Sequence, residues 1–413
     1  MEILRVAVIG SGTMGSGIAM ALANAGVPLV LTDASSDALA HGLATIERTY
    51  ASAVERGRIT ADERDQRLRR ITTVDGDAGV GEVDLVIEAA FEDLAVKQHL
   101  FERLAAVTRD ECILATNTST LDIDAIASPT MRPQRVLGMH FFSPAAVMRL
   151  VEVVRGARTD PSAVESVVDF ARRIGKVPVV VGNCDGFVGN RMLLRYRREA
   201  ELALERGAAP AQVDAALQRF GFAMGPFAVA DVAGIDIGWR AKQERNKRGG
   251  LPFRVSDIPD RFVEAGRLGQ KSGAGYYRYE GGDRTPHPDP VADEIIATER
   301  ARLGIVPHSV SDADIVSRCV TALINEGARI LEEGIASSAS DIDTIWRTGY
   351  GFPAERGGPM AYADATGLDH VLDAVRRYAK EDAAFWSAPA LLERLVDRGE
   401  RFEALRKEAP RPC

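Results

Sequence analysis

One histidine and one glutamate stand where they could act together as a base and its partner. His140 ends a short apolar run, Val136–Met139, that has the pattern of a buried strand, and Glu152 lies in the next such run, Leu150–Val154. A carboxylate beside an imidazole orients the ring and favours its protonated form, which suits a group that takes the proton of an alcohol. Because the neighbours of Glu152 are apolar, we expect its charge to have a partner. A structural histidine and a strand-surface acid are the alternatives.

A glycine pattern near the N-terminus predicts a dinucleotide site. Gly10, Gly12 and Gly15 form G-x-G-x-x-G directly after the strand expected at Arg5–Ile9 and before a helical stretch. The three glycines allow a tight turn, close approach of a pyrophosphate, and close packing of helix on strand. Asp33 ends the next strand, where an acid bonds ribose hydroxyls and would repel a 2′-phosphate. A structural turn is the alternative for the glycines alone, but the strand, glycines, helix and acid together predict NAD.

The elements that must position these residues are those of a doubly wound α/β sheet. Short β-branched runs alternate with longer amphipathic stretches, as a parallel sheet buried on both faces requires. We expect the last strands to run antiparallel, because the segments between them are too short for full helical crossovers. The expected strands are Arg5–Ile9, Pro28–Thr32, Leu85–Ile87, Ile113–Thr116, Val136–His140, Leu150–Val154 and Val177–Val181.

Beyond Asn183 the pattern becomes helical and contains an internal repeat. The segment GFAMGPFAVADVAGID (221–236) returns as GFPAERGGPMAYADATGLD (351–369), and residues 199–207 correspond to residues 326–334. A Gly/Pro-rich linker lies at residues 280–290. The fold class is therefore a Rossmann-type α/β domain followed by two related all-α helical domains. The expected boundaries are 1–183 for the NAD-binding domain, 184–285 for the first helical domain and 300–413 for the second; helices are expected at 186–207, 210–220, 312–334 and 340–347.

Composition excludes several classes of function. The net charge of −8 argues against non-specific binding of nucleic acid, which needs a basic face. The four cysteines lack the C-x-x-C spacing, so we expect neither a disulfide framework nor a metal site. No apolar run reaches the length of a membrane span, and a strand begins almost at the first residue, leaving no room for a signal peptide. We expect a cytoplasmic protein that binds no membrane.

The sequence resembles the 3-hydroxyacyl-CoA dehydrogenase family over nearly its whole length. The stretches that carry the resemblance are VAVIGSGTMGSGIA (6–19), IEAAFEDLAVKQ (87–98), ATNTSTL (115–121), GMHFFSPAAVMRLVEVV (138–154), DGFVGNRML (185–193) and GRLGQKSGAGYYRY (266–279). The resemblance implies that His140 is the catalytic base and Glu152 its orienting partner. It also implies that Ser119 binds the substrate oxygen and that Asn190 completes the site from the helical domain. By their types alone, Ser119 and its neighbours could cap the next helix, and Asn190 could bond backbone at a helix start.

The same resemblance assigns further residues to the cofactor. Glu92, Lys97, Asn117 and Lys271 match positions that contact NAD or its nicotinamide end. The family usually has HFFNP where this chain has HFFSP, so Ser143 replaces an asparagine; a hydroxyl can still donate and accept. Solvated surface charge is the alternative for the two lysines.

The repeated helical domain resembles the dehydrogenase half of multifunctional β-oxidation enzymes, without the hydratase half that precedes it there. We therefore expect reversible oxidation of (S)-3-hydroxyacyl-CoA to 3-ketoacyl-CoA and no hydration. The second helical copy could take the place of a partner subunit, giving a monomer with an intrachain pseudo-dimer; a homodimer is the alternative. Arg56 and Arg58 are candidates for CoA binding. A dehydrogenase of a free hydroxyacid and a non-catalytic NAD-binding redox sensor remain alternative functions.

Overall fold

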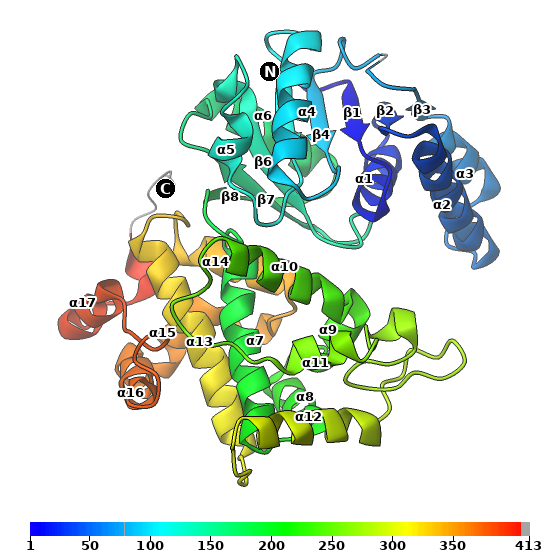
Figure 1. The fold of residues 1–413 in the computed structure, drawn as a ribbon. Coiled ribbons are helices and arrows are strands. Elements are labelled where there is room, and N and C mark those ends of the chain that lie inside the picture. The colour runs from blue at the N-terminus through cyan, green and yellow to red at the C-terminus, as the bar shows by residue number, and fades with distance from the viewer. Residues whose placement is uncertain (78, 406–413) are drawn as a thin grey trace. The chain divides into compact units, whose positions relative to one another are not determined.

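The computed structural model describes residues 1–77 and 79–405 and separates into two compact units (Figure 1). The sheet unit comprises Met1–Gly189 together with Glu333–Gly349. The helical unit comprises Asn190–Glu332 together with residues 350–405. The chain therefore crosses between the units more than once, and a helix from the second repeat belongs to the sheet unit.

The sheet unit is built on one sheet with the strand order β3-β2-β1-β4-β5-β6-β7-β8. All neighbouring strands pair in parallel except β6 and β7, which pair antiparallel. Its order reverses between β1 and β4, the kind of position where open α/β sheets bind ligands. The strands are β1 (Val6–Ile9), β2 (Leu29–Thr32), β3 (Ile71–Thr73), β4 (Leu85–Glu88), β5 (Ile113–Thr116), β6 (Val136–Phe141), β7 (Leu150–Arg155) and β8 (Val177–Gly182).

The central strands form where the sequence has unbroken apolar runs, because both faces of the sheet are covered. Every residue of β1, β4, β5 and β6 is buried, including the polar Glu88 and His140. The helices of this unit are α1 (Thr13–Asn24), α2 (Ser36–Glu55), α3 (Ala61–Leu68), α4 (Leu94–Val107), α5 (Ile123–Ala127), α6 (Pro161–Arg173) and α14 (Ala339–Gly349), with a short 3-10 turn, η1 (Pro133–Arg135).

The helical unit contains most of the two repeat copies, and their long helices α7 and α13 lie side by side (Figure 1). Ion pairs from α7 to Glu326 on α13 join the two helices. The helices are α7 (Gly189–Arg206), α8 (Pro210–Phe220), α9 (Pro226–Ala233), α10 (Ile235–Lys247), α11 (Ile258–Glu264), α12 (Pro290–Arg302), α13 (Asp312–Glu332), α15 (Pro359–Thr366), α16 (Leu368–Ala379) and α17 (Ala390–Arg398), with 3-10 turns η2 (Gln270–Ser272), η3 (Ala354–Arg356) and η4 (Phe402–Ala404).

The repeat seen in the sequence has a common structural basis in one aspartate. The carboxylate of Asp231 accepts hydrogen bonds from two successive backbone amides, those of residues 276 and 277. The matching Asp364 accepts from two successive amides as well, those of residues 402 and 403. In each copy a buried or half-buried carboxylate thus anchors a returning segment by two charge-assisted hydrogen bonds. The ordered matches between the copies reflect the same local fold.

The predicted fold class is confirmed, and the differences lie in short or peripheral elements. All seven expected strands are present, whereas β3 (Ile71–Thr73) is an additional edge strand, partly exposed and only three residues long. The antiparallel step is confirmed between β6 and β7. The reason given for it is wrong for β7 and β8, which are joined by the crossover helix α6 and run parallel. Helix α12 (Pro290–Arg302) also lies where no helix was predicted.

The second repeat contributes to the sheet unit in a way that the sequence did not predict. Its helix α14 packs against β7 and β8. The amide of Gly182, which ends β8, donates to the carbonyl of Ile335 at 2.7 Å, and Val181 forms an antiparallel bridge with Ala336. Gly349 lies so close to Leu150 that a Cβ there would be 2.4 Å from the leucine side chain. The start of the strand that carries Glu152 is therefore covered by the second repeat.

Candidate active site

The glycine loop after β1 is shaped to admit a ligand at one of its three glycines. Gly10 has φ +96°, and a Cβ there would lie 2.6 Å from the Ala89 carbonyl oxygen; a Cβ on Gly15 would lie 1.8 Å from the Gly10 oxygen. Gly12, by contrast, has nothing within 4 Å of a Cβ position. Gly10 and Gly15 are thus required by the fold, whereas the space above Gly12 is free for a ligand.

The same loop leaves the start of α1 open to an anion. Gly12 is the N-cap residue of α1, and no side chain caps the free amides of the first turn. Such amides, together with the positive end of the helix dipole, favour a phosphate group. The residues present therefore fit the pyrophosphate of a dinucleotide.

Asp33 lies at the end of β2, close to the glycine loop. Its Oδ2 accepts hydrogen bonds from the Ser11 amide at 2.7 Å and the Ser11 hydroxyl at 2.8 Å. Oδ1 has a long contact, 3.4 Å, with the Ser35 amide. One carboxylate oxygen therefore fixes the loop while the other can accept from ribose hydroxyls. The contact with Ser11 was not predicted, because nothing in the glycine pattern specifies the second residue of the loop.

His140 and Glu152 are directly opposite each other in the antiparallel pair β6–β7. His140 Nδ1 lies 2.8 Å from Glu152 Oε2, and the two residues are 6% and 0% exposed. The other carboxylate oxygen accepts from the amides of Val188 at 3.2 Å and Gly189 at 2.9 Å. The predicted pairing is confirmed, and both oxygens of the buried carboxylate have donors, as its burial requires.

The surroundings of the histidine ring are apolar on two sides. The ring of Phe142 lies 4.4 Å and that of Phe187 5.7 Å from the His140 ring, centroid to centroid. Phe187 has φ +51°, a left-handed conformation that is uncommon for a bulky residue and is found mainly where function or packing demands it. With Nδ1 held by the carboxylate, Nε2 is the ring nitrogen available to exchange a proton with a ligand.

A buried ion pair lies at the carboxyl ends of β4 and β5, and sequence reasoning found only one of its members. Glu88 is fully buried; it accepts from Lys97 Nζ at 2.5 Å, from the Thr116 hydroxyl at 2.6 Å and from the Ala90 amide at 2.7 Å. Lys97 is 1% exposed, so its interpretation as a solvated surface charge is wrong. Glu88 gave no signal because a single acid at the end of an apolar strand has no distinctive spacing.

Lys97 connects this ion pair to Glu92 and the loop of Ser119. Lys97 Nζ lies 3.4 Å from Glu92 Oε2. Glu92 Oε1 accepts from the Thr118 hydroxyl at 2.6 Å and from the Ser119 amide at 2.9 Å. The structure therefore brings together three of the predicted site residues, Glu92, Lys97 and Ser119, at one edge of the sheet.

The loop that holds Ser119 does not cap the following helix. Helix α5 is capped by Asp122, whose side chain accepts from the Asp124 amide at 2.8 Å. Asn117 Oδ1 accepts from the amide of Phe141 at 2.8 Å and so ties the end of β5 to the end of β6, one residue after His140. Ser143 lies two residues beyond Phe141, in the loop that joins β6 to β7.

Two predicted site residues, Asn190 and Lys271, belong to the helical unit. Asn190 follows Gly189 at the start of α7, and its Oδ1 accepts from the Tyr350 hydroxyl at 2.9 Å. Lys271 lies in η2 and forms an ion pair with Asp236, with 48% of its side chain exposed. Their roles at the site stay predictions.

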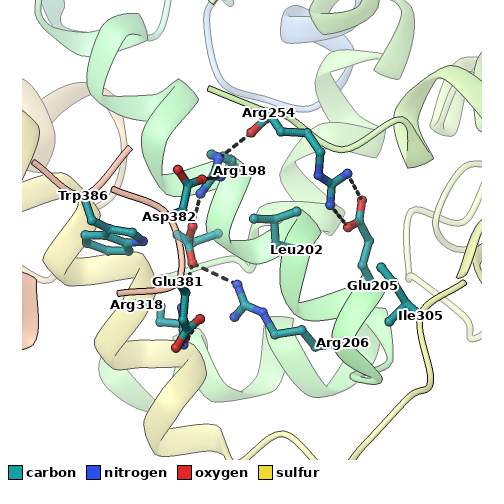
Figure 2. A pocket seen from close by; sticks show the side chains of 11 residues that line it. Arg198, Leu202, Glu205, Arg206, Arg254, Ile305, Arg318, Glu381, Asp382 and Trp386 are labelled. Atoms are coloured by element: carbon teal, nitrogen blue, oxygen red, sulfur yellow. Dashed lines mark hydrogen bonds and ion pairs between the residues drawn. The ribbon is translucent and has the colours of Figure 1, made fainter. Parts of the chain in front are cut away.

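A charged cavity of about 230 Å³ lies within the helical unit, between α7 and α13 (Figure 2). Its arginines each meet a carboxylate, as Arg254 meets Glu205 and Arg206 meets Glu199. Because the charges balance, the lining has no excess of either sign to attract an ion. The residues are Arg198, Glu199, Leu202, Glu205, Arg206, Arg254, Ile305, Arg318, Glu381, Asp382 and Trp386.

The glycine loop, the acid after β2 and the buried His–Glu pair define an oxidoreductase of the dinucleotide-binding class. Comparison with known families agrees: residues 5–184 match the 3-hydroxyacyl-CoA dehydrogenase NAD binding domain. Residues 186–279 and 315–408 each match the C-terminal domain of the same family. The chain belongs to the 3-hydroxyacyl-CoA dehydrogenase family, and the second match coincides with the internal repeat.

Individual relatives support the assignment over almost the whole chain. The peroxisomal bifunctional enzyme of Danio rerio is 44% identical over 412 residues, which are 96% of this chain and 57% of the relative. The chain therefore spans little more than half the length of that relative. The crystal structure of 3-hydroxybutyryl-CoA dehydrogenase from Escherichia coli K12 aligns with a TM-score of 0.83 at 30% identity, covering 96% of this chain and 99% of that one.

A second solved structure also aligns with almost the whole chain. The dehydrogenase part of multifunctional enzyme 1 from C. elegans aligns with a TM-score of 0.69 at 30% identity, covering 95% of this chain and 90% of that one.

Among the residues that the structure describes, no helix is both long enough and apolar enough to cross a membrane. Some relatives are named as peroxisomal, so the predicted cytoplasmic location stays a prediction.

Proposed function

We propose that the chain catalyses the reversible, NAD-dependent oxidation of an (S)-3-hydroxyacyl-CoA to a 3-ketoacyl-CoA. The observation that carries the proposal is the buried His140–Glu152 pair beside an open glycine loop, in a member of this family. An imidazole held at Nδ1 by a carboxylate can take an alcohol proton at Nε2. NAD⁺, when bound, supplies the acceptor for the hydride that leaves C3 of the substrate.

His140 and Glu152 divide the proton chemistry between them. His140 accepts the hydroxyl proton during oxidation and returns it during reduction. The Glu152 carboxylate then lies against an imidazolium and stabilises its charge, in surroundings from which water is largely excluded. The two backbone amides on its second oxygen keep the carboxylate in place throughout.

Ser119 and Asn190 are proposed to hold the substrate oxygen as its charge changes. Ser119 Oγ has a long contact of 3.4 Å with Glu92, so its hydroxyl can turn to a ligand without breaking a strong hydrogen bond. For Asn190, the hydrogen bond from Tyr350 occupies Oδ1, which directs the amide nitrogen toward any other partner. Both roles rest on the family resemblance.

The cofactor residues fall into two groups. Gly10, Gly12, Gly15 and Asp33 would hold the pyrophosphate and the adenosine ribose, as the open loop and the weakly bonded Oδ1 of Asp33 suggest. A second group would hold the nicotinamide end: Glu92, Lys97, Asn117, Ser143 and Lys271. Lys97 is surrounded by Glu88 and Glu92, so we propose that it acts mainly by fixing Glu92.

The experiment that tests the proposal compares substrates and cofactors on the intact chain. We expect NADH to be consumed with acetoacetyl-CoA but not with free acetoacetate, and NADPH to be a poor replacement because of Asp33. A series from four-carbon to sixteen-carbon acyl-CoA then defines chain length. Equal or faster reaction with the free acid would favour the free-hydroxyacid dehydrogenase, and binding of NADH without turnover would favour a redox sensor.

Variants of Arg56 and Arg58, both exposed, test the candidates for CoA binding.

We also propose that the two helical copies form a pseudo-dimer within one chain, allowing a monomer. Ion pairs between α7 and α13 are reciprocal: Arg191 meets Glu326 at 2.6 Å, and Arg318 meets Glu199 at 3.7 Å. In the repeat, Arg191 corresponds to Arg318 and Glu199 to Glu326, so each copy offers the same pair to the other, as subunits of a twofold dimer would. The charged cavity of Figure 2 lies at this junction.

Sedimentation of the intact chain tests the pseudo-dimer. A monomer is expected, and a dimer assembled through residues 300–413 would contradict it. The three-domain division at 1–183, 184–285 and 300–413 remains part of this proposal; residues 406–413 lie outside the described part of the chain. Separate expression of 300–413 would test whether that segment folds alone, which the packing of α14 on the sheet argues against.

A further inference from the structure

A buried lysine outside the residues discussed so far contacts the loop between the two catalytic strands. Lys176 lies between α6 and β8 and is 8% exposed. Its Nζ donates to the carbonyl oxygens of Ala145 at 2.6 Å and Met148 at 2.7 Å. Within the described part of the chain, no carboxylate lies at ion-pair distance from this nitrogen, and burial lowers the pKa of the ammonium group. Burying an ammonium group is costly unless strong hydrogen bonds offset the loss of solvation. The hydrogen bonds to the two carbonyls supply this offset for Lys176.

The two carbonyls belong to a loop that is important for the proposed site. Residues 142–149 join β6, which carries His140, to β7, which carries Glu152. Ser143, the residue that replaces the family's usual asparagine, lies two positions before Ala145. The loop is therefore the part of the chain that places Ser143 relative to the catalytic pair.

The loop is held from two sides. On one side, Ala145 is 2% exposed and packs so closely on α1 that a Cβ on Gly17 would lie 3.2 Å from the Ala145 Cβ. On the other side, Lys176 binds both halves of the loop, and the amide of Val177 donates to the Arg149 carbonyl at 2.8 Å. Helix α1 begins at the glycine loop, so the same helix borders the dinucleotide site and contacts the loop of Ser143.

We propose that Lys176 is a positioning residue for the nicotinamide end of the cofactor, acting through the loop that carries Ser143; this rests on the proposed function. Inside the loop, the Pro144 carbonyl accepts from the amides of Val147 and Met148, each at 2.9 Å, and so closes a turn. A neutral side chain at position 176 would leave the carbonyls of Ala145 and Met148 buried without their donor. The loop would then move toward water, and Ser143 would move with it.

The test compares two ligands that differ only at the nicotinamide. ADP-ribose has the adenosine, pyrophosphate and second ribose of NADH but no nicotinamide ring. In Lys176→Met of the full chain, calorimetry should show a Kd for NADH raised about tenfold or more, and a Kd for ADP-ribose within about twofold of wild type. Lys176→Gln, which keeps a neutral donor, should weaken NADH less. Arg172→Met, which removes a positive charge that is 66% exposed on α6, should change neither.

Each other outcome has a defined meaning. Equal weakening of both ligands in Lys176→Met and Lys176→Gln would show a general effect on the fold and overturn the proposal, as would unchanged binding of both. If Lys176→Met does not fold, the ratio of the two Kd values in Lys176→Gln decides in the same way. Wild-type protein that binds ADP-ribose and NADH equally would overturn the proposal, since no nicotinamide contact would exist to be positioned. Wild-type protein that binds neither would instead refute the proposed function, and the inference with it.

Discussion

Replacing Glu152 by glutamine should remove most of the turnover while leaving the fold and the cofactor site intact. The carboxylate accepts from His140 with one oxygen and from two backbone amides with the other. A glutamine of the same shape has only one acceptor oxygen. If this oxygen kept His140, the amide NH₂ would face the amides of Val188 and Gly189, donor against donor, at a cost of about 1–3 kcal/mol for each unsatisfied group.

Glutamine will therefore turn its oxygen to the backbone amides and its NH₂ to His140 Nδ1. The ring must then accept at Nδ1 and carry its proton at Nε2, the wrong tautomer for a base. It also loses the negative charge that stabilises the imidazolium. We expect kcat to fall roughly 10²–10⁴-fold, the range for a lost acid–base function, and the free energy of unfolding to fall by no more than about 2 kcal/mol.

Loss of NADH absorbance with acetoacetyl-CoA measures kcat, fluorescence titration measures the Kd for NADH, and thermal unfolding measures stability. Glu165→Gln is the matched control, because Glu165 is an exposed glutamate on α6 of the same unit. Glu152→Gln with wild-type kcat would refute the tautomer argument. Equal losses of turnover and NADH affinity would mean that the carboxylate acts on the fold of the site and not on the histidine.

Two further predictions concern the glycine loop and a buried acid. Gly12→Ala has space in the fold, so stability should be unchanged while the Kd for NADH rises at least about tenfold; Gly10→Ala should instead lose about 1–3 kcal/mol of stability, and the reverse pattern would contradict the assigned geometry. Burial raises the pKa of Asp214 from 3.8 to about 6, against hydrogen bonds from Phe227, Tyr277 and Ala228. The folded state therefore holds the proton of Asp214 more tightly than the unfolded chain does. The stabilisation from this proton is fully present below about pH 3.8 and is lost as the pH rises toward 6, which lowers the free energy of unfolding by at most about 3 kcal/mol. Stability curves of wild type and Asp214→Asn should differ in slope across that interval, and parallel curves would show that the pKa is not raised.

The sequence predicted most of the sheet because its strands have strong local signals. The runs at β1, β4, β5 and β6 are mostly apolar, as strands covered on both faces must be, and each was located within one or two residues. The edge strand β3 lacks this signal, since two of its three residues are threonines. It pairs with β2 on one side and is only partly buried, so it does not need an apolar run. The placement of α14 on β7 and β8 depends on contacts far apart in the chain, which no local pattern encodes.

The site was predicted in part, for a similar reason. The pairing of His140 with Glu152 followed from adjacent strands and the expense of an unpaired buried charge, and the register confirms it. Glu88 and Lys176 were missed, since each acts through atoms that only the folded chain brings near: Lys97 in one case, two loop carbonyls in the other. Glu88 ends its apolar strand as a single acid, and the sequence alone does not show which residue would pair with it.

The role of His140 as the catalytic base is tested by the turnover of His140→Gln with acetoacetyl-CoA and NADH, measured beside the Kd for NADH. Glutamine can occupy the space of the ring but cannot accept and return the alcohol proton. We expect an unchanged Kd for NADH and a kcat lower by roughly 10²–10⁴-fold. Turnover close to that of the wild type would contradict it, because the proton would then be carried by another group.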